Sequence, residues 1–465
     1  MNKKPLAVTL MSAAAFGMML GTSCKKENGN VVNERSVLAG KPPKTDSTIT
    51  GVITSNLFLS NTKNYLLSGL VYVANSATLT IEHGTWIGGI KSTGTGPGGG
   101  LIITRGSKII ADGLLANGTN DPIVFSSNEA NPVSGDWSGV VLLGQAPTNH
   151  AAAVRIEGIP DNEPADATYG GPANNNSSDN SGILRYVRIE YAGYELSTDN
   201  ELNGLTLGGV GNGTILDYIE VYKSKDDAFE FFGGTVNASH LVAIDALDDM
   251  FDTDNGYSGT ISYALGVSDP NRADKSQSNG FESDNNAAGG YVTPYTHPTY
   301  NNITIIGQPT AAAASITNGQ PSGNGKYGRA AHLRRNAEFA INNSIFLGFN
   351  YGITQDTTLP GGVPGVPNTL SKYWSGISTL TTNYVHAYIN AYDKEGNSNH
   401  FAITPLGTTN KAYVSTNPNA SILLSAPFAA TRVIGNYIPQ SLSPAKNAGA
   451  FPTGNTTWAN GWTIL

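Results

Sequence analysis

The segment DDAFE at residues 226–230 is followed 22 residues later by DDMFD at residues 248–252. The same spacing separates apolar residues nearer the N-terminus, where Leu79 recurs as Leu101. A unit of 22 residues is too short to bury a core of its own, so it must stack on its neighbours. The repeat therefore predicts a solenoid.

The repeating unit has the composition of β-strands. It alternates apolar positions with Thr, Val, Ile and Tyr, and its turns are rich in Gly, Asn and Asp. Strand-like segments continue in two interleaved series, and insertions interrupt them at 268–278, 286–299 and 308–328. The sequence predicts an all-β fold, a single right-handed parallel β-helix (solenoid) with loop insertions, and we expect the insertions to line one side of it.

Composition narrows the class of partner. The chain has 465 residues and a formal net charge of −8, and only 13% of its residues are charged. Lys and Arg form no cluster, and a protein needs such clusters to neutralise the phosphates of nucleic acid. We therefore expect no nucleic-acid partner. We also expect a monomer.

The N-terminus carries a targeting signal. Lys3 and Lys4 precede an apolar run at residues 6–20, which ends in small residues before Cys24, the only cysteine. This pattern resembles a bacterial lipoprotein signal peptide over residues 1–23, with Cys24 lipidated as the new N-terminus. An ordinary secretory signal followed by a chance cysteine is the alternative interpretation.

The segment after the cysteine predicts a flexible tether. Residues 24–48 are polar, contain two consecutive prolines and lack periodicity. Residues 49–465 are then expected to form the β-helix with a C-terminal closing segment. No later segment is apolar enough to span a membrane. We expect a protein of the bacterial outer membrane, held at the cell surface by the lipid on Cys24.

The repeat also predicts which side chains share a face. Phe229, Phe251 and Phe281 occupy equivalent positions that should point inward, and side chains alternate along a strand, so the residues after them should point outward. Two adjacent outward columns follow from this alignment: Glu230, Asp252, Glu282 and His332 in the first, and Asp254, Asp284 and Arg334 in the second.

Carboxylates stacked in this way repel one another. Parallel strands lie ~4.8 Å apart, and each such contact costs about 1 kcal/mol at water-like dielectric. A bound cation offsets this repulsion, and Ca²⁺ suits the role because it takes several carboxylate oxygens in flexible geometry. Raised carboxyl pKa values or nearby Lys and Arg are the other solutions. The predicted ligands of Ca²⁺ are Glu230, Asp252, Asp254, Glu282 and Asp284.

The turns before these strands hold further charges. Asp226, Asp227, Asp248 and Asp249 either add acceptors to the site or simply cap backbone donors, and turn residues of this kind usually do the latter. Lys223, Lys225 and Arg334 are the candidates for counter-charge.

Several segments resemble a family of secreted β-helix proteins that is common in Bacteroidota-type bacteria. LTIEHGT (79–85) and PIVFSS (122–127) resemble its opening rungs, RYVRIEYAG (185–193) and DDAFEFFGGTVN (226–237) its central motifs, and residues 449–463 its closing motif. The resemblance implies a pectate-lyase-like β-helix at the cell surface. The family is largely uncharacterised and supplies no catalytic residues.

The outward acidic stripe suggests the binding of an extracellular polysaccharide, because a long face matches a long polymer. Processing of that glycan is open. A polysaccharide lyase would use the cation to neutralise a uronate and Arg334, His332 or a lysine as base. A glycoside hydrolase would use Asp252 and Glu282 as an acid/base pair. The alternative is a structural or adhesive surface protein without catalysis, since acidic residues are common on solvated strands.

Overall fold

A computed structural model describes residues 40–94, 96–161, 163–197, 200–358 and 366–465. The predicted signal peptide, Cys24 and the predicted tether up to residue 39 lie outside the described residues. Strand β1 (Asp46–Ile53) begins before the expected start at Ile49, so the end of the predicted tether is already strand. Among the described residues, no helix combines the length and apolarity that crossing a membrane requires.

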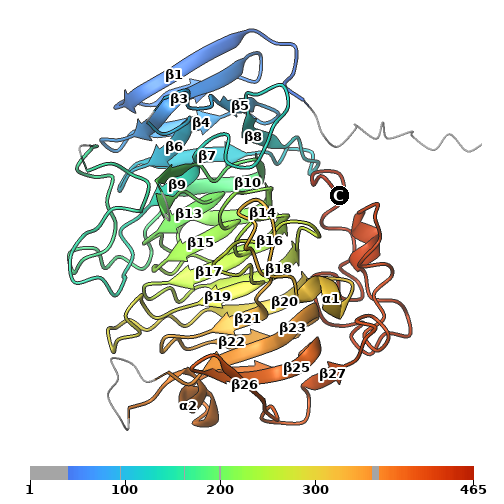
Figure 1. Cartoon of the computed structure of the whole chain (residues 1–465). Coiled ribbons are helices and arrows are strands. Elements are labelled where there is room, and N and C mark those ends of the chain that lie inside the picture. The colour runs from blue at the N-terminus through green and yellow to red at the C-terminus, as the bar shows by residue number, and fades with distance from the viewer. Residues whose placement is uncertain (1–39, 95, 162, 198–199, 359–365) are drawn as a thin grey trace, which may run out of the picture. The chain divides into compact units, whose positions relative to one another are not determined.

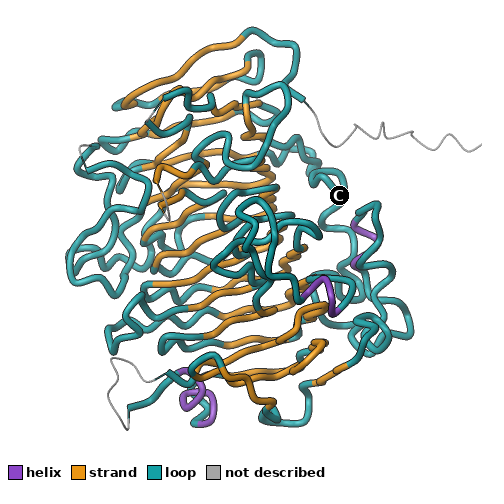
Figure 2. The backbone as a smooth tube through the Cα atoms, in the orientation of Figure 1, coloured by secondary structure: helices purple, strands orange, loops and turns teal. Residues whose placement is uncertain are grey.

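Twenty-five strands join in one sheet whose strands are parallel from coil to coil (Figure 1). The strands form three ladders, which we call A, B and C, and loops leave the coils where one ladder passes to the next (Figure 2). In the described part of the chain, the helices are the short α1 (Ala311–Ala314), α2 (Thr369–Trp374) and a 3-10 turn at Ile434–Tyr437. The predicted all-β parallel β-helix with loop insertions is confirmed.

Ladder A combines short strands with the first part of five longer ones. Its members are β2 (Leu57–Leu59), β4 (Thr78–Ile81), β7 (Lys108–Asp112), β10 (Gly182–Glu190), β14 (Ile215–Tyr222), β16 (Ala238–Ile244), β18 (Thr260–Val267), β20 (Thr299–Ile306), β22 (Ala340–Asn342) and β24 (Thr379–Thr381).

Ladder B contains the second part of those five long strands. It also takes the first part of β1, β3 (Asn64–Val73), β23 (Ile345–Asp356) and β25 (Tyr384–Gly396), together with β5 (Trp86–Gly89), β8 (Ile123–Ser127) and β27 (Lys411–Val414).

Ladder C carries the predicted outward columns. Its members are the last parts of β1, β3, β23 and β25, with β6 (Gly100–Ile103), β9 (Gly139–Leu143), β13 (Leu205–Gly208), β15 (Phe229–Phe232), β17 (Phe251–Asp254), β19 (Phe281–Ser283) and β21 (Arg329–Leu333). Strand β26 (Asn399–Ala402) pairs antiparallel with β25, and β11 (Glu195–Ser197) with β12 (Asn200–Glu201).

The bend between ladders A and B stacks its own residues. Tyr186, Tyr218 and His240 each adopt a positive φ of 52–55° at this bend. Their rings stack with centroids 4.3 Å apart at each step. A left-handed backbone costs a non-glycine residue about 1–2 kcal/mol, and ring stacking offsets part of that cost.

The interior is a column of equivalent side chains. Phe229, Phe251 and Phe281 are fully buried, and their ring centroids lie 5.4 and 5.5 Å apart on successive coils. The inward positions predicted from the repeat are therefore correct. Their outward neighbours on the same strands face away from this core.

Two segments cover parts of the outer surface. The insertion between β9 and β10, residues 144–181, packs Ile156 and Tyr169 against Ile102 and Val141, on the outside of the first coils of ladder C. The C-terminal segment, residues 415–465, packs on the outside of ladder B instead, where Trp458 and Trp462 join an apolar cluster (Figure 1, red). The first acidic coils of ladder C follow directly after the part that the insertion covers.

Candidate functional site

The register of ladder C places the predicted acidic residues beside one another. Glu230 on β15 pairs with Asp252 on β17, Asp252 pairs with Glu282 on β19, and Glu282 pairs with His332 on β21. Insertions between these strands lengthen the loops and leave the pairing unchanged. The first outward column therefore stands as the 22-residue alignment predicts.

One outward column changes chemistry along its length. After the exposed Val52 come Tyr72, Ile102 and Val141, which are buried under the insertion. It continues through the buried Thr206 to Glu230, where the carboxylates begin. The insertion that packs on the apolar part of the column explains why that part is apolar, but it does not explain the carboxylates that follow.

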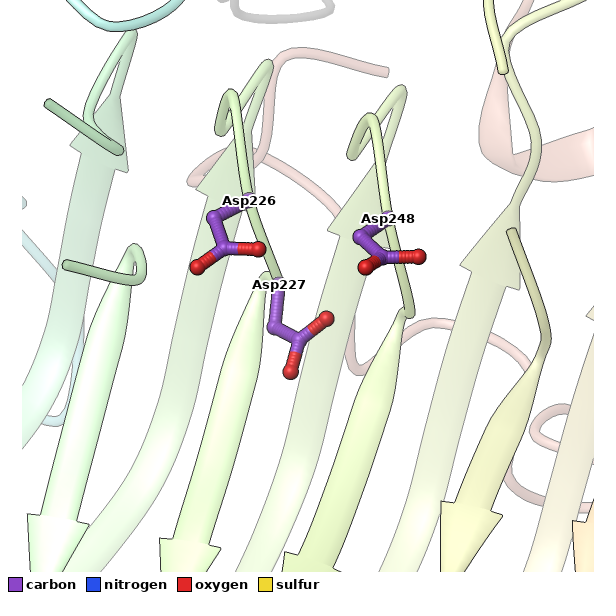
Figure 3. A group of neighbouring side chains, drawn as sticks. All are labelled: Asp226, Asp227 and Asp248. Atoms are coloured by element: carbon purple, nitrogen blue, oxygen red, sulfur yellow. The ribbon is translucent and has the colours of Figure 1, made fainter. Parts of the chain in front are cut away.

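The turns before β15 and β17 bring more carboxylates to the same place. Asp226 and Asp227 come from one turn and Asp248 from the next, and their side chains lie near each other (Figure 3). The backbone N–H of Asp249 donates to Asp227 Oδ1 at 2.8 Å, and the N–H of Asn279 donates to Asp249 Oδ1 at 2.5 Å. Asp227 and Asp249 therefore cap the following coil, as the turn interpretation holds.

Three sets of carboxylates each bring one oxygen per residue within 4.8 Å of the others. The sets are Asp226, Asp227 and Asp248; Asp227, Glu230 and Asp252; and Asp249, Asp252 and Glu282. Because Asp227 and Asp252 each belong to two sets, the three sets form one continuous path of oxygens. Asp227 and Asp249 thus accept hydrogen bonds from backbone N–H groups, and they also lie close enough to other carboxylates to share one cation with them.

We call seven of these residues the acid block: Asp226, Asp227, Glu230, Asp248, Asp249, Asp252 and Asp254. Burial raises the pKa of every one of them, and the next largest cause is in each case another carboxylate, which raises it further. The pKa of Asp226 and that of Asp254 each rise to about 8. Within the described ranges, no lysine, arginine or histidine forms an ion pair with the block.

The acid block offers oxygen donors of the kind that Ca²⁺ prefers. Asp252 Oδ1 is buried and has no hydrogen-bond partner among the described residues. Glu230, which is 8% exposed, accepts one hydrogen bond from the side-chain amide of Asn203. The donor set therefore fits a hard divalent cation, with Asp252 as the shared ligand of two sets.

The next coils neutralise their charges internally. Arg334 bridges Glu282 and Asp284, with Nε 2.9 Å from Asp284 Oδ1, and Arg335 approaches Asp284 Oδ2 at 2.7 Å. Burial alone would raise the pKa of Glu282, but the hydrogen bond from His332 and the charge of Arg334 outweigh it and lower the pKa. The same two carboxylates raise the pKa of Arg334 against the effect of burial, so Arg334 serves as a counter-ion rather than a proton acceptor.

His332 sits between two carboxylates. Its Nδ1 lies 3.5 Å from Glu282 Oε2 and its Nε2 lies 3.3 Å from Glu395 Oε2, which Arg329 also contacts at 2.6 Å. Burial would raise the pKa of Glu395, but His332 and Arg329 outweigh it and lower the pKa to about 2. We call Glu282, Asp284, Arg329, His332, Arg334, Arg335 and Glu395 the ion-pair block.

The structure thus divides the residues predicted to bind Ca²⁺. Glu230, Asp252 and Glu282 belong to the close sets, whereas Asp254 and Asp284 do not, and Asp284 already holds two arginines. Arg334 supplies counter-charge as expected. Lys225 pairs with Glu195 instead, and Lys223 forms no ion pair with a described residue, so the expectation that these lysines neutralise the stripe is wrong.

Sequence reasoning missed Arg329 and Glu395. Glu395 lies at the end of β25, where the repeat is too irregular to align, and Arg329 opens β21 directly after a long insertion. In the register of β21, β23 and β25, Arg329 lies level with Tyr351 and Asn390, so its contact with Glu395 runs diagonally across β23.

Comparison with known proteins agrees with this architecture. The sequence profile of one family, described as a pectate-lyase-like beta helix domain, matches residues 51–463. Neither the curated proteins nor the solved structures give a match. The profile spans every coil of ladder C as well as the C-terminal segment, and the chain therefore belongs to the pectate-lyase-like beta helix family.

Proposed function

We propose that this protein binds an extracellular polysaccharide at the acid block, and that Ca²⁺ joins the carboxylates to the glycan. The observation that supports this most is the contrast in neutralisation. Six carboxylates of the acid block take part in the close sets, and none of them forms an ion pair with a described residue, while Arg334, Arg335 and His332 neutralise the carboxylates of the adjoining coils.

The donor count leaves room for the ligand. Ca²⁺ takes six to eight oxygens, and each of the close sets supplies one oxygen from each of three carboxylates, with second oxygens also at hand. Water and glycan hydroxyl or anionic groups would complete the coordination. When bound, the cation would neutralise the block and hold anionic groups of the glycan against it.

The repeat suits a polymer. Successive strands lie ~4.8 Å apart, so equivalent positions recur along the coils and a linear ligand can meet several in turn. The proposed setting is the surface of a bacterial outer membrane, with a lipid on Cys24 as the anchor. In any processing of the bound glycan, Arg334 cannot act as the base, since it is held as a cation.

A structural or adhesive protein without catalysis is the second candidate. The ion pairing of Glu282, Asp284 and Glu395 supports it, because a general acid or base must be free to exchange its proton. This candidate predicts binding without any product.

A glycan array probed with and without Ca²⁺, followed by product detection on each glycan bound, tests the proposal. Asp227→Asn combined with Asp252→Asn removes a ligand from all three close sets. Asp161→Asn is the matched control, because it removes one exposed charge elsewhere. Ca²⁺-dependent binding that the double variant loses and the control keeps would support the proposal. Glycan binding that neither EDTA nor the double variant reduces would refute it.

A further inference from the structure

A pocket of about 330 Å³ lies outside the acid block, at the turns that lead from ladder B into ladder C. Four separate turns contribute to it, those that precede β9, β15, β19 and β21. Its polar lining consists of Lys223, Lys225, Arg272 and Ser134. Its remaining lining residues are Pro132, Val133 and Pro321.

The pocket carries positive charge in excess. Lys223 forms no ion pair with a described residue, and its Nζ lies 5.1 Å from the ring centroid of Tyr222. Lys225 pairs with Glu195, which does not line the pocket. Arg272 donates to Ser134 Oγ at 2.8 Å and lies 3.9 Å from Asp269, at the outer limit of an ion pair.

We propose that this pocket binds an anionic saccharide unit through its carboxylate or sulfate group. The inference rests on the proposed function and names the class of glycan: a polysaccharide that carries such groups. Lys and Arg form their strongest hydrogen bonds with anionic oxygens, and the planar guanidinium of Arg272 matches both carboxylate and sulfate.

The size and the apolar lining favour a sugar over a bare ion. A volume of about 330 Å³ is at the lower end of pockets that hold small organic molecules. Pro132, Val133 and Pro321 give apolar surface on which the C–H face of a sugar ring can pack, while Ser134 adds a hydroxyl.

Two chain segments join the pocket to the acid block. The turn at 223–227 gives Lys223 and Lys225 to the pocket and then continues into Asp226 and Asp227. The loop at 268–278 gives Arg272 to the pocket, and its Ser276 donates to Asp248 Oδ2 at 2.8 Å. One anionic polymer can therefore meet the lysines directly and the carboxylates through a cation.

Calorimetric titration of the whole protein in EDTA and low salt tests the pocket without the cation. The probes are galacturonate, glucose 6-sulfate, glucose and inorganic sulfate. We expect at least one acidic sugar to bind, glucose not to bind, and added salt to weaken binding. Lys223→Gln and Arg272→Gln should each weaken it about tenfold or more, because each removes a charged hydrogen bond.

Lys326→Gln is the matched control, since it removes one exposed positive charge from the loop that also carries Pro321 but lies outside the pocket. Thermal melting of each variant confirms its fold, and either pocket variant suffices if the other is unstable. Galacturonate against glucose 6-sulfate decides between carboxylate and sulfate.

Three results would overturn the inference: no binding of either acidic sugar, binding that both pocket variants leave unchanged, or inorganic sulfate binding as tightly as the sugars. Because EDTA removes free Ca²⁺, this test is independent of the glycan array. If the array shows no Ca²⁺-dependent binding but acidic sugars bind the pocket in EDTA, the acid-block proposal is refuted. If the array shows Ca²⁺-dependent binding but no acidic sugar binds the pocket, only the pocket inference is refuted.

Discussion

The acid block and the ion-pair block lie on successive coils of ladder C and share one backbone register, yet their charges are balanced in opposite ways. In the ion-pair block, Arg334 and His332 lower the pKa of Glu282. In the acid block, one rung away, burial and then neighbouring carboxylates raise the pKa of Asp252.

This difference indicates where a ligand belongs. A column whose charges pair internally stabilises the fold by itself, whereas a column of unpaired carboxylates costs free energy of folding until protons or cations arrive. The fold can supply arginine beside these columns, because Arg334 contacts both Glu282 and Asp284, so the lack of cations among the described residues around the acid block is not imposed by geometry. Four experiments test the contrast, from the largest expected effect to the smallest.

Arg334→Ala should be the most damaging change. It leaves the buried carboxylates of Glu282 and Asp284 without their shared cation, and removing one partner of a buried pair costs about 3–5 kcal/mol. Urea unfolding measures the loss. Arg335→Ala is the control, because that side chain is 40% exposed and contacts only Asp284, so its loss should cost under about 1 kcal/mol. Equal losses would mean that the ion-pair block is not held by Arg334.

Addition of Ca²⁺ should stabilise the protein through the acid block. A ligand at about 100 times its dissociation constant adds ~2.7 kcal/mol to the free energy of unfolding. We expect a higher melting temperature in Ca²⁺ than in EDTA, and a smaller effect of Mg²⁺, which demands a stricter octahedral geometry. The same melting curve in Ca²⁺ and EDTA would count against a cation site.

The pH dependence should differ between the blocks. Asp226 and Asp254 of the acid block keep their protons in the folded state up to pH about 8, while in the unfolded state they lose them near pH 4. In EDTA, stability should therefore fall as pH rises from about 4 to about 8, by about 1.4 kcal/mol per pKa unit that persists in solution. Ca²⁺ should flatten this fall.

Glu395 of the ion-pair block acts at the other end of the pH range. Because the pKa of Glu395 is lowered to about 2, its contribution to stability is lost as pH falls from about 4.5 towards 2. Glu395→Gln should remove part of this acid limb and leave the alkaline fall intact. Glu220, whose pKa burial raises to about 8 outside ladder C, also contributes to the alkaline fall. Asp252→Asn must therefore reduce that fall if the acid block causes it.

The smallest expected effect is a difference in sign between two variants: neutralising a carboxylate should stabilise the acid block and destabilise the ion-pair block. At a pH alkaline enough to ionise the acid block, Asp252→Asn removes a repelling charge and should stabilise the protein in EDTA by about 1 kcal/mol. Glu282→Gln, on the adjoining rung, removes a partner of Arg334 and should destabilise it by about the same amount. Thermal melts of both variants measure the effect. Shifts of the same sign would show that the two blocks do not differ as described.

The register of the strands in ladder C can be predicted from the sequence because the repeated strand motif resumes after each insertion. The neighbours of Glu230, Asp252, Glu282 and His332 follow from aligning their inward partners, whatever the loop lengths between them. Alternation along a strand also fixes which residues face outward. This is why the fold and the first outward column could be predicted.

Which charged side chains contact one another could not be predicted in the same way. Lys223 and Lys225 lie in a turn, where strand alternation no longer determines direction, and they face a pocket rather than the stripe. The cover over Ile102 and Val141 comes from an insertion without periodicity. The contact between Arg329 and Glu395 joins two strands that β23 separates, so neither local pattern nor the repeat reports it.

The C-terminal segment has a consequence for how the molecule comes apart. Stacked repeats commonly melt coil by coil from an end. Here the N–H of Ile464 donates to the buried Glu220 at 2.9 Å, and Arg432 reaches back to Asp245 at 2.5 Å. The last residues of the chain thus latch onto coils formed two hundred residues earlier, which links the late coils to the middle ones and should turn gradual fraying into a single cooperative step.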